Sequence, residues 1–244
     1  EPVYLSREST SLVNGVFIWL VFLRHLGQYH PELGGVDAWL LAHEGGFLGQ
    51  LIVAPFFFFS GWGMMCSLQK KGKDYVRSLV CIRFPGLLLK FAAAVLVFWG
   101  VQGVLGQSYS REQVLLSLVG WQSLGNSNWF IFMTLLTYLV VAGVFALIPQ
   151  NKRSLGVLAV FALLSLVIFK MSGFKMRYWY DTILCLPAGM LWCECCKCFS
   201  ATLLRRGRLA AVVLLPAGWW VYDSASELTR GWPVLSCWSG NMLA

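Results

Sequence analysis

The stretch from Trp129 to Ile148, WFIFMTLLTYLVVAGVFALI, decides the fold of this chain. It contains no charged side chain, and a helix of about 20 apolar residues is long enough to cross the hydrocarbon core of a bilayer. The rest of the chain has the same character, because 58% of all residues are hydrophobic and only 12% are charged. Soluble domains have roughly 25% charged residues. The composition therefore predicts an integral membrane protein.

Further apolar blocks of similar length lie on both sides of this stretch, separated by charged or Gly/Pro-rich segments. Blocks of this length predict transmembrane helices. We expect an all-α, polytopic bundle of about seven transmembrane helices that forms a single membrane-embedded domain over residues 1–244. The expected spans cover about residues 12–29, 47–67, 84–105, 129–148, 155–171, 179–193 and 209–223.

Basic residues are concentrated in alternate connections between these spans, and such residues near span ends favour the cytoplasmic side. The formal charge of +8 thus indicates membrane topology and not nucleic-acid binding. We expect a multi-pass protein of the cell membrane with a cytoplasmic amino terminus, directed there by its first span because no removable signal peptide is recognisable. The cytoplasmic cations are Lys70, Lys71, Lys73, Arg77 and Arg83 after the second span, Lys152 and Arg153 after the fourth, and Lys197, Arg205, Arg206 and Arg208 after the sixth.

One connection departs from this rule. Lys170, Lys175 and Arg177 would lie outside, between the fifth and sixth spans. Single connections violate the rule often enough for a topology error to be one explanation. The alternative is that these cations bind a ligand.

The first span carries a polar stripe. His25 lies near its outer end, where an ionisable group is costly unless it faces a polar cavity or partner, and imidazole suits proton transfer near neutral pH. Asn14 stands eleven positions earlier, which places both side chains on one helix face about 16 Å apart. Arg7 extends the stripe if the helix reaches it. The alternative is that Asn14 and His25 only mark the two interfacial ends of the span.

The second span contains the run Pro55–Met65, PFFFFSGWGMM. Pro55 opens or kinks the helix, and Ser60 with the following glycines lets a neighbouring helix approach closely. Packing therefore explains this run by itself. Ser60 would act as a nucleophile only with a general base within hydrogen-bonding reach.

Two polar segments lead into the fourth and sixth spans from the outer side. Asn126, Asn128 and Trp129 combine amides with an aromatic ring, which indicates either a recognition surface for a carbohydrate-like ligand or a helix cap with an interfacial anchor. Tyr180 and Asp181 begin the sixth span, and a carboxylate at that depth needs a cationic partner. The candidate substrate-binding residues therefore gather on the outer face.

The chain has eight cysteines, most of them within or beside spans and toward the predicted cytoplasmic side. We expect free thiols there. The cluster Cys193, Cys195, Cys196 and Cys198 lacks the paired spacing of a zinc site, and a helix end at the membrane is a poor cage for a tetrahedral ion. Free or acylated thiols are the preferred interpretation, and we expect no bound metal.

Five segments in order along the chain are relevant to function: Val21–His25, Pro55–Met65, Tyr75–Pro85, Asn126–Phe130 and Tyr178–Asp181. Together they resemble the acyltransferase 3 family of membrane O-acyltransferases. The resemblance extends from about Tyr4 to Met190. It implies an enzyme with no bound cofactor that moves an acyl group, commonly acetyl from acetyl-CoA, to a hydroxyl of a cell-surface glycan or related acceptor.

The resemblance also implies roles for single residues. His25 matches the family's catalytic histidine, and Arg83 lies in a matching segment that would contact the donor. The mechanism also needs a hydrogen-bond donor to the carbonyl oxygen, and the candidates for it are Ser60, Asn126 and Asn128. Asn14 occupies a position where the family usually has Arg or Lys, so either Arg7 or Lys90 replaces that cation or the chain is weakened. The family also has more spans, and we expect this chain to be truncated at its carboxyl end.

Two alternatives to an enzyme remain. In a membrane transporter, His25, Asp181 and the outer lysines would line a substrate path. That function would favour two halves with corresponding broken helices, and the two halves of this chain show no repeat. The second alternative is a non-catalytic membrane scaffold. It would need neither the cation that Asn14 replaces nor the family's additional spans.

Overall fold

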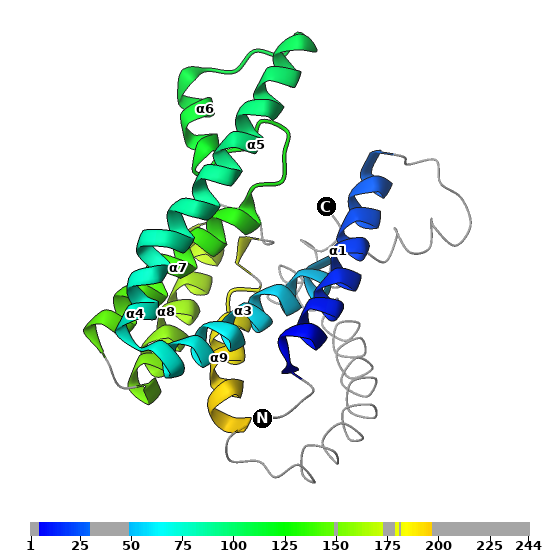
Figure 1. Ribbon diagram of the computed structural model, residues 1–244. Coiled ribbons are helices and arrows are strands. Elements are labelled where there is room, and N and C mark those ends of the chain that lie inside the picture. Colours follow the sequence, from blue (N-terminus) through cyan, green and yellow to red (C-terminus); the bar gives the residue numbers. More distant parts are fainter. Residues whose placement is uncertain (1–4, 30–48, 149–150, 173–178, 181, 197–244) are drawn as a thin grey trace, which may run out of the picture. The chain divides into compact units, whose positions relative to one another are not determined.

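The computed structural model is all-α and describes residues 5–29, 49–148, 151–172, 179–180 and 182–196 (Figure 1). The chain forms two compact units, residues 57–193 and residues 1–56 with 194–244. The helices of the described residues are α1 (Arg7–Tyr29), α3 (Gly49–Lys71), α4 (Lys73–Ser78), the π-helix η3 (Leu79–Arg83), α5 (Phe84–Val104), α6 (Arg111–Leu118), α7 (Trp129–Leu147), α8 (Asn151–Ser172) and α9 (Cys185–Cys195).

Four helical segments are long and apolar enough to cross a membrane: Ile52–Lys71, Lys73–Val104, Trp129–Leu147 and Lys152–Phe169. They match the second to fifth predicted spans and indicate a multi-pass membrane protein. Large apolar side chains are exposed along them, as in a surface that faces lipid. The first predicted span lies within α1, and the seventh, at about 209–223, lies outside the described residues.

The third span is longer than predicted, and the turn at Gly72 separates it from the second. Helical structure runs from Lys73 through α4, η3 and α5 to Val104, eleven residues earlier than the start predicted at Phe84. Pro85 explains the π-turn, because it has no N–H to donate and its ring crowds the carbonyl four residues before it. A wider turn accommodates the ring, and the Phe84 N–H bonds the Leu79 carbonyl five residues back. The chain thereby stays helical through the proline.

Helix α7 is the centre of the unit formed by residues 57–193. It contacts α4, η3, α5 and α8 and buries side chains along its whole length, among them Met133, Val141 and Phe145. Helix α6 packs against α5 at the end farthest from α4 (Figure 1). The connection between α5 and α7 therefore contains a helix that was not predicted from the sequence. Its start is a capping box in which Ser110 and Gln113 exchange hydrogen bonds.

Helices α3 and α9 cross with their backbones almost in contact. A Cβ atom on Gly61 would collide with the Leu186 carbonyl, and a Cβ atom on Gly189 would collide with the Phe58 carbonyl. Small residues permit such an approach between membrane helices, where dispersion contacts replace the hydrophobic effect as the driving force. The packing role predicted for the Pro55–Met65 run is thus present at Gly61.

The sixth predicted span, 179–193, is wrong in its start and length. Trp179 and Tyr180 lie in a short turn, residues 182–184 form another turn, and α9 begins only at Cys185. Pro187 explains the late start, since it has no N–H for the carbonyl of Ile183 and disfavours helical backbone before it. The 11 residues of α9 rise about 16 Å, which is too short to cross a bilayer.

We predict that Gly61→Ala lowers the free energy of unfolding by about 1–3 kcal/mol, because the new methyl group overpacks the crossing. Gly63→Ala is the matched control, since it lies two residues away on α3 and a Cβ there meets nothing within 4 Å. Both changes add the same helix propensity. Thermal unfolding of the detergent-solubilised chain measures the difference. Equal midpoints for the two variants would contradict the close α3–α9 approach.

Candidate functional site

The polar stripe predicted on the first span is present on α1. The helix begins at Arg7, and at about 100° per residue Arg7, Asn14 and His25 lie within about 20° of one another around the axis. Asn14 and His25 are both half-buried. The Asn14 Oδ1 is fully buried and has no hydrogen-bond partner in the part of the chain that the structure describes. A buried acceptor without a donor is costly, so this face is suited to a donor group from elsewhere.

Ser60 is the second-span candidate. It lies in α3, one residue before the crossing at Gly61, and its side chain is exposed. Among the described residues no general base bonds its hydroxyl. A serine needs such a base to become a nucleophile, so the geometry gives Ser60 no support in that role. A role as a hydrogen-bond donor stays a prediction.

Arg83 is held in place by an aromatic ring. Its guanidinium carbon lies 4.9 Å from the ring centroid of Tyr75, which is within the range of a cation–π contact. Tyr75 is 2% exposed, so the ring itself is fixed, whereas Arg83 is exposed. The result is a guanidinium that contacts a fixed ring and stays accessible to solvent or a ligand.

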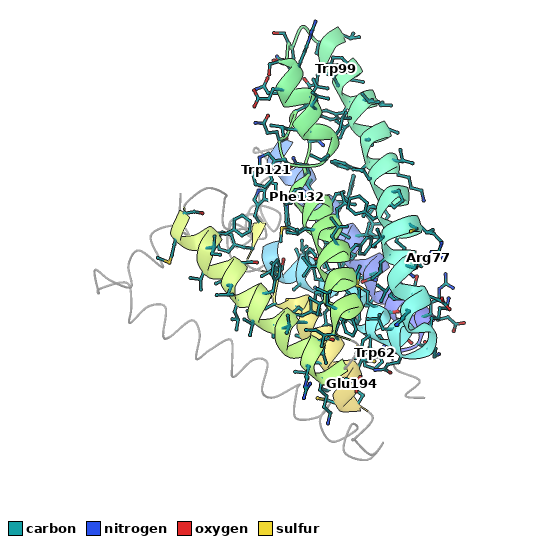
Figure 2. All side chains as sticks on the ribbon, turned by 90° about the vertical axis from the view of Figure 1, so that its left-hand side faces the viewer. Trp62, Arg77, Trp99, Trp121, Phe132 and Glu194 are labelled. Carbon is teal, nitrogen blue, oxygen red and sulfur yellow. The ribbon has the colours of Figure 1, made fainter. Side chains whose placement is uncertain are left out.

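The π-turn creates this pairing. Eight positions separate Tyr75 from Arg83, which in a regular α-helix would turn their side chains about 80° apart. The extra residue accommodated by η3 offsets about one 100° step, so the pair lies on nearly the same face. A regular α-helical pattern does not predict that Tyr75 and Arg83 share one helix face. Four more exposed cations precede Arg83 closely in the chain: Lys70, Lys71, Lys73 and Arg77. Figure 2 shows Arg77 projecting away from the helices.

The segment between α6 and α7 is built around two asparagines. The buried Asn128 side chain donates to the Gln122 carbonyl, and the Asn126 Oδ1 accepts from the Leu124 N–H at 3.1 Å. Asn128 precedes α7 without a side-chain capping bond. Its amide nitrogen is therefore engaged in holding the segment, while Asn126 and Trp129 are half-buried.

Three aromatic rings pack together beside this segment. The ring centroids of Trp121 and Phe132 are 5.1 Å apart, and Trp179 lies 5.6 Å from Phe132 and 6.1 Å from Trp121. Figure 2 shows Trp121 and Phe132 together at the start of α7. Tyr180 is buried and stacks on Phe169 of α8. The structure thus brings the residues around Asn128 and Trp179 to one region, whereas Asp181 lies outside the described residues.

An apolar cavity of ≈ 30 Å³ lies between α7, α8 and the start of α9. Among its lining residues Thr137 is the one with a polar side chain. This volume holds one or two water-sized molecules and excludes a coenzyme or a sugar. The cavity is therefore a packing feature between helices.

The sequence-based candidates fall into separate groups in the structure. Asn14 and His25 belong to the unit that contains residues 1–56, and Ser60, Arg83, Asn126, Asn128, Trp129 and Tyr180 belong to the other. Sequence reasoning missed Tyr75 as the support of Arg83, and it missed the ring cluster of Trp121, Phe132 and Trp179. No protein family, curated protein or solved structure matches the chain.

We predict that Asn128→Asp loosens the segment between α6 and α7. The isosteric carboxylate removes the amide donor and places an oxygen against the Gln122 carbonyl, at a cost of about 1–3 kcal/mol. Ser127→Ala is the control, because Ser127 is the exposed neighbour. Amide hydrogen exchange over residues 120–132 should rise in Asn128→Asp and not in the control. Unchanged exchange in both variants would show that the Asn128 bond is dispensable.

Proposed function

We propose that this chain is a membrane O-acyltransferase that resembles the acyltransferase 3 family. It would move an acetyl or other acyl group from acyl-CoA to a hydroxyl of a cell-surface glycan or related acceptor. The observation that carries the proposal is the polar face of α1, where His25 lies near one end and the buried Asn14 Oδ1, near the other, has no hydrogen-bond partner among the described residues. Polar groups inside a membrane helix are costly and are generally functional.

In this proposal His25 is the general base. Its imidazole takes the proton of the acceptor hydroxyl while that oxygen attacks the thioester carbonyl carbon. The carbon–sulfur bond then breaks, and the proton passes to the leaving thiolate, so that the products are an ester and free coenzyme A. Negative charge develops on the carbonyl oxygen during the attack and needs a hydrogen-bond donor. Asn126 and Ser60 stay candidates for this donor on the basis of the sequence, and the Asn128 amide already has a partner.

Arg83 supplies the donor-binding part of the proposal. A planar guanidinium binds phosphate through two parallel N–H groups, and the cation–π contact with Tyr75 restricts where the Arg83 guanidinium lies. The neighbouring lysines raise the local positive potential. With a cytoplasmic amino terminus this basic end faces the cytoplasm, where acyl-CoA is found.

The acceptor would bind at the opposite end of the bundle. Asn126 and Trp129 are half-buried beside the cluster of Trp121, Phe132 and Trp179. Tyr180 and Asp181 follow that cluster in the chain. A mixture of amides, a carboxylate and aromatic rings fits a sugar hydroxyl acceptor.

One observation favours a second candidate function. Asn14 stands where the resemblance leads us to expect a cation, and an amide does not neutralise an anionic donor. A non-catalytic membrane scaffold would tolerate this residue. The two candidate functions predict different results: a folded acyltransferase transfers a labelled acyl group from acyl-CoA, and a folded scaffold does not.

We predict that membranes containing this chain transfer labelled acetyl from acetyl-CoA to a glycan fraction, and that His25→Ala lowers the rate about a hundred- to ten-thousand-fold through loss of the general base. Gly15→Ala on the same helix is the control, since a Cβ there meets nothing within 4 Å. Asn14→Arg should raise the rate if the missing cation limits activity. Full transfer by His25→Ala would refute the assignment, and folded but inactive chains throughout would favour the scaffold.

We predict that Arg83→Lys raises the KM for acyl-CoA about tenfold with a smaller change in kcat. The substitution keeps the charge and removes the planar, stacked group that makes paired bonds to phosphate. Lys152→Gln, which removes an exposed cation elsewhere on the predicted cytoplasmic side, should leave the KM unchanged. Steady-state transfer kinetics at varied acyl-CoA separate the two. Equal KM values for Arg83→Lys and the unaltered chain would argue that Arg83 contacts lipid and not the donor.

A further inference from the structure

Two cysteines that are distant in sequence lie side by side in the unit formed by residues 57–193. The Sγ atoms of Cys66 on α3 and Cys193 on α9 are 3.2 Å apart, although 127 positions separate the residues. Neither cysteine forms a disulfide in the structure. Cys66 is half-buried, while Cys193 is 4% exposed. The two thiols are therefore in contact with each other, and Cys66 is the more accessible to solvent.

The helix crossing fixes this contact. Gly61 and Gly189 bring α3 and α9 together at the crossing point, and the two cysteines follow their glycines by five and four residues. Those distances correspond to about 6–8 Å along each helix axis, so the thiols lie just beyond the point of closest approach. Neither backbone can move away without opening the glycine contacts.

We propose that Cys66 and Cys193 form a reversible disulfide that covalently links α3 to α9. The oxidant is a small-molecule or protein disulfide. The Cys66 thiolate attacks one sulfur of that disulfide, which releases one thiol and leaves a mixed disulfide on Cys66. The Cys193 thiolate then attacks the Cys66 sulfur and releases the second thiol. Two protein thiols are thereby oxidised and one oxidant disulfide is reduced to two thiols.

The difference in access sets the order of these steps. Half-buried Cys66 meets the oxidant, and buried Cys193 is the resolving thiol. Thiol reactivity depends on access as well as on ionisation. Cys81 and Cys185 serve as comparison thiols, because neither has another described sulfur within hydrogen-bonding distance. A reversible disulfide needs such a pair, and among the described residues neither Cys81 nor Cys185 has one.

Closing the link restricts the unfolded chain, because it joins residues that are far apart in sequence. Oxidation should therefore raise the thermal unfolding midpoint of the unit by several degrees, on the order of 5 °C. It should also hold α9 at its crossing with α3. The inference does not depend on acyl transfer, since it rests on the thiol pair and the glycine crossing alone.

The test uses the full chain in detergent micelles, equilibrated with glutathione buffers of rising disulfide content and then blocked with N-ethylmaleimide. Peptide mass spectrometry should find a Cys66–Cys193 cross-link that dithiothreitol removes, while Cys81 and Cys185 form no cross-link within the chain and go no further than a mixed disulfide with glutathione. In Cys193→Ser, Cys66 should stop at the mixed disulfide with glutathione. Cys81→Ser should cross-link as the unaltered chain does.

The cross-link map of the unaltered chain decides the proposal even if Cys193→Ser does not fold. Cys66 that stays alkylated at every glutathione ratio would overturn it. So would a cross-link from Cys193 to Cys195 or Cys196 in place of Cys66. A midpoint that does not rise on oxidation would overturn the stabilising consequence.

Discussion

The absence of water inside a bilayer is the constraint on which this structure depends. Every backbone N–H and C=O group there needs a partner within the protein, and the chain meets this demand with long helices. The proline at position 85 is accommodated by a π-turn and the helix continues. That turn aligns Arg83 with the Tyr75 ring. A local solution to a backbone problem thus produces the most clearly positioned cation of the described residues.

The same constraint governs how helices associate. Burial of apolar surface gives little driving force between helices in lipid, so close packing has to supply it. Gly61 and Gly189 allow the α3 and α9 backbones to touch, and the thiols of Cys66 and Cys193 are brought together as a consequence. Helix α7 has the opposite character, with many large buried side chains in contact with several neighbours. The bundle therefore combines one glycine crossing with one central helix of bulky residues.

The sequence predicted the second to fifth spans because long apolar blocks are a strong signal that needs no knowledge of neighbours. It missed the short α6, although the Ser110–Gln113 spacing is a recognisable helix start. It overestimated α9, where apolar composition outweighed the effect of Pro187. The contacts of Arg83 with Tyr75 and of Cys66 with Cys193 lay beyond prediction, since one requires a π-turn and the other joins distant residues. Asn14 and His25 were predicted to share a face, and α1 has this geometry, while their proposed chemistry stays a prediction.

The membrane crossing of α5 is the central physical claim, and epitope access tests it most directly. One short tag is inserted after Gly106 and, in a separate chain, one after Gly72; both glycines are exposed turn residues with positive φ. Antibody binding is then compared in intact cells and after permeabilisation. The account predicts that the Gly106 tag binds antibody in intact cells and that the Gly72 tag binds only after permeabilisation. Equal access of both tags in intact cells would contradict it.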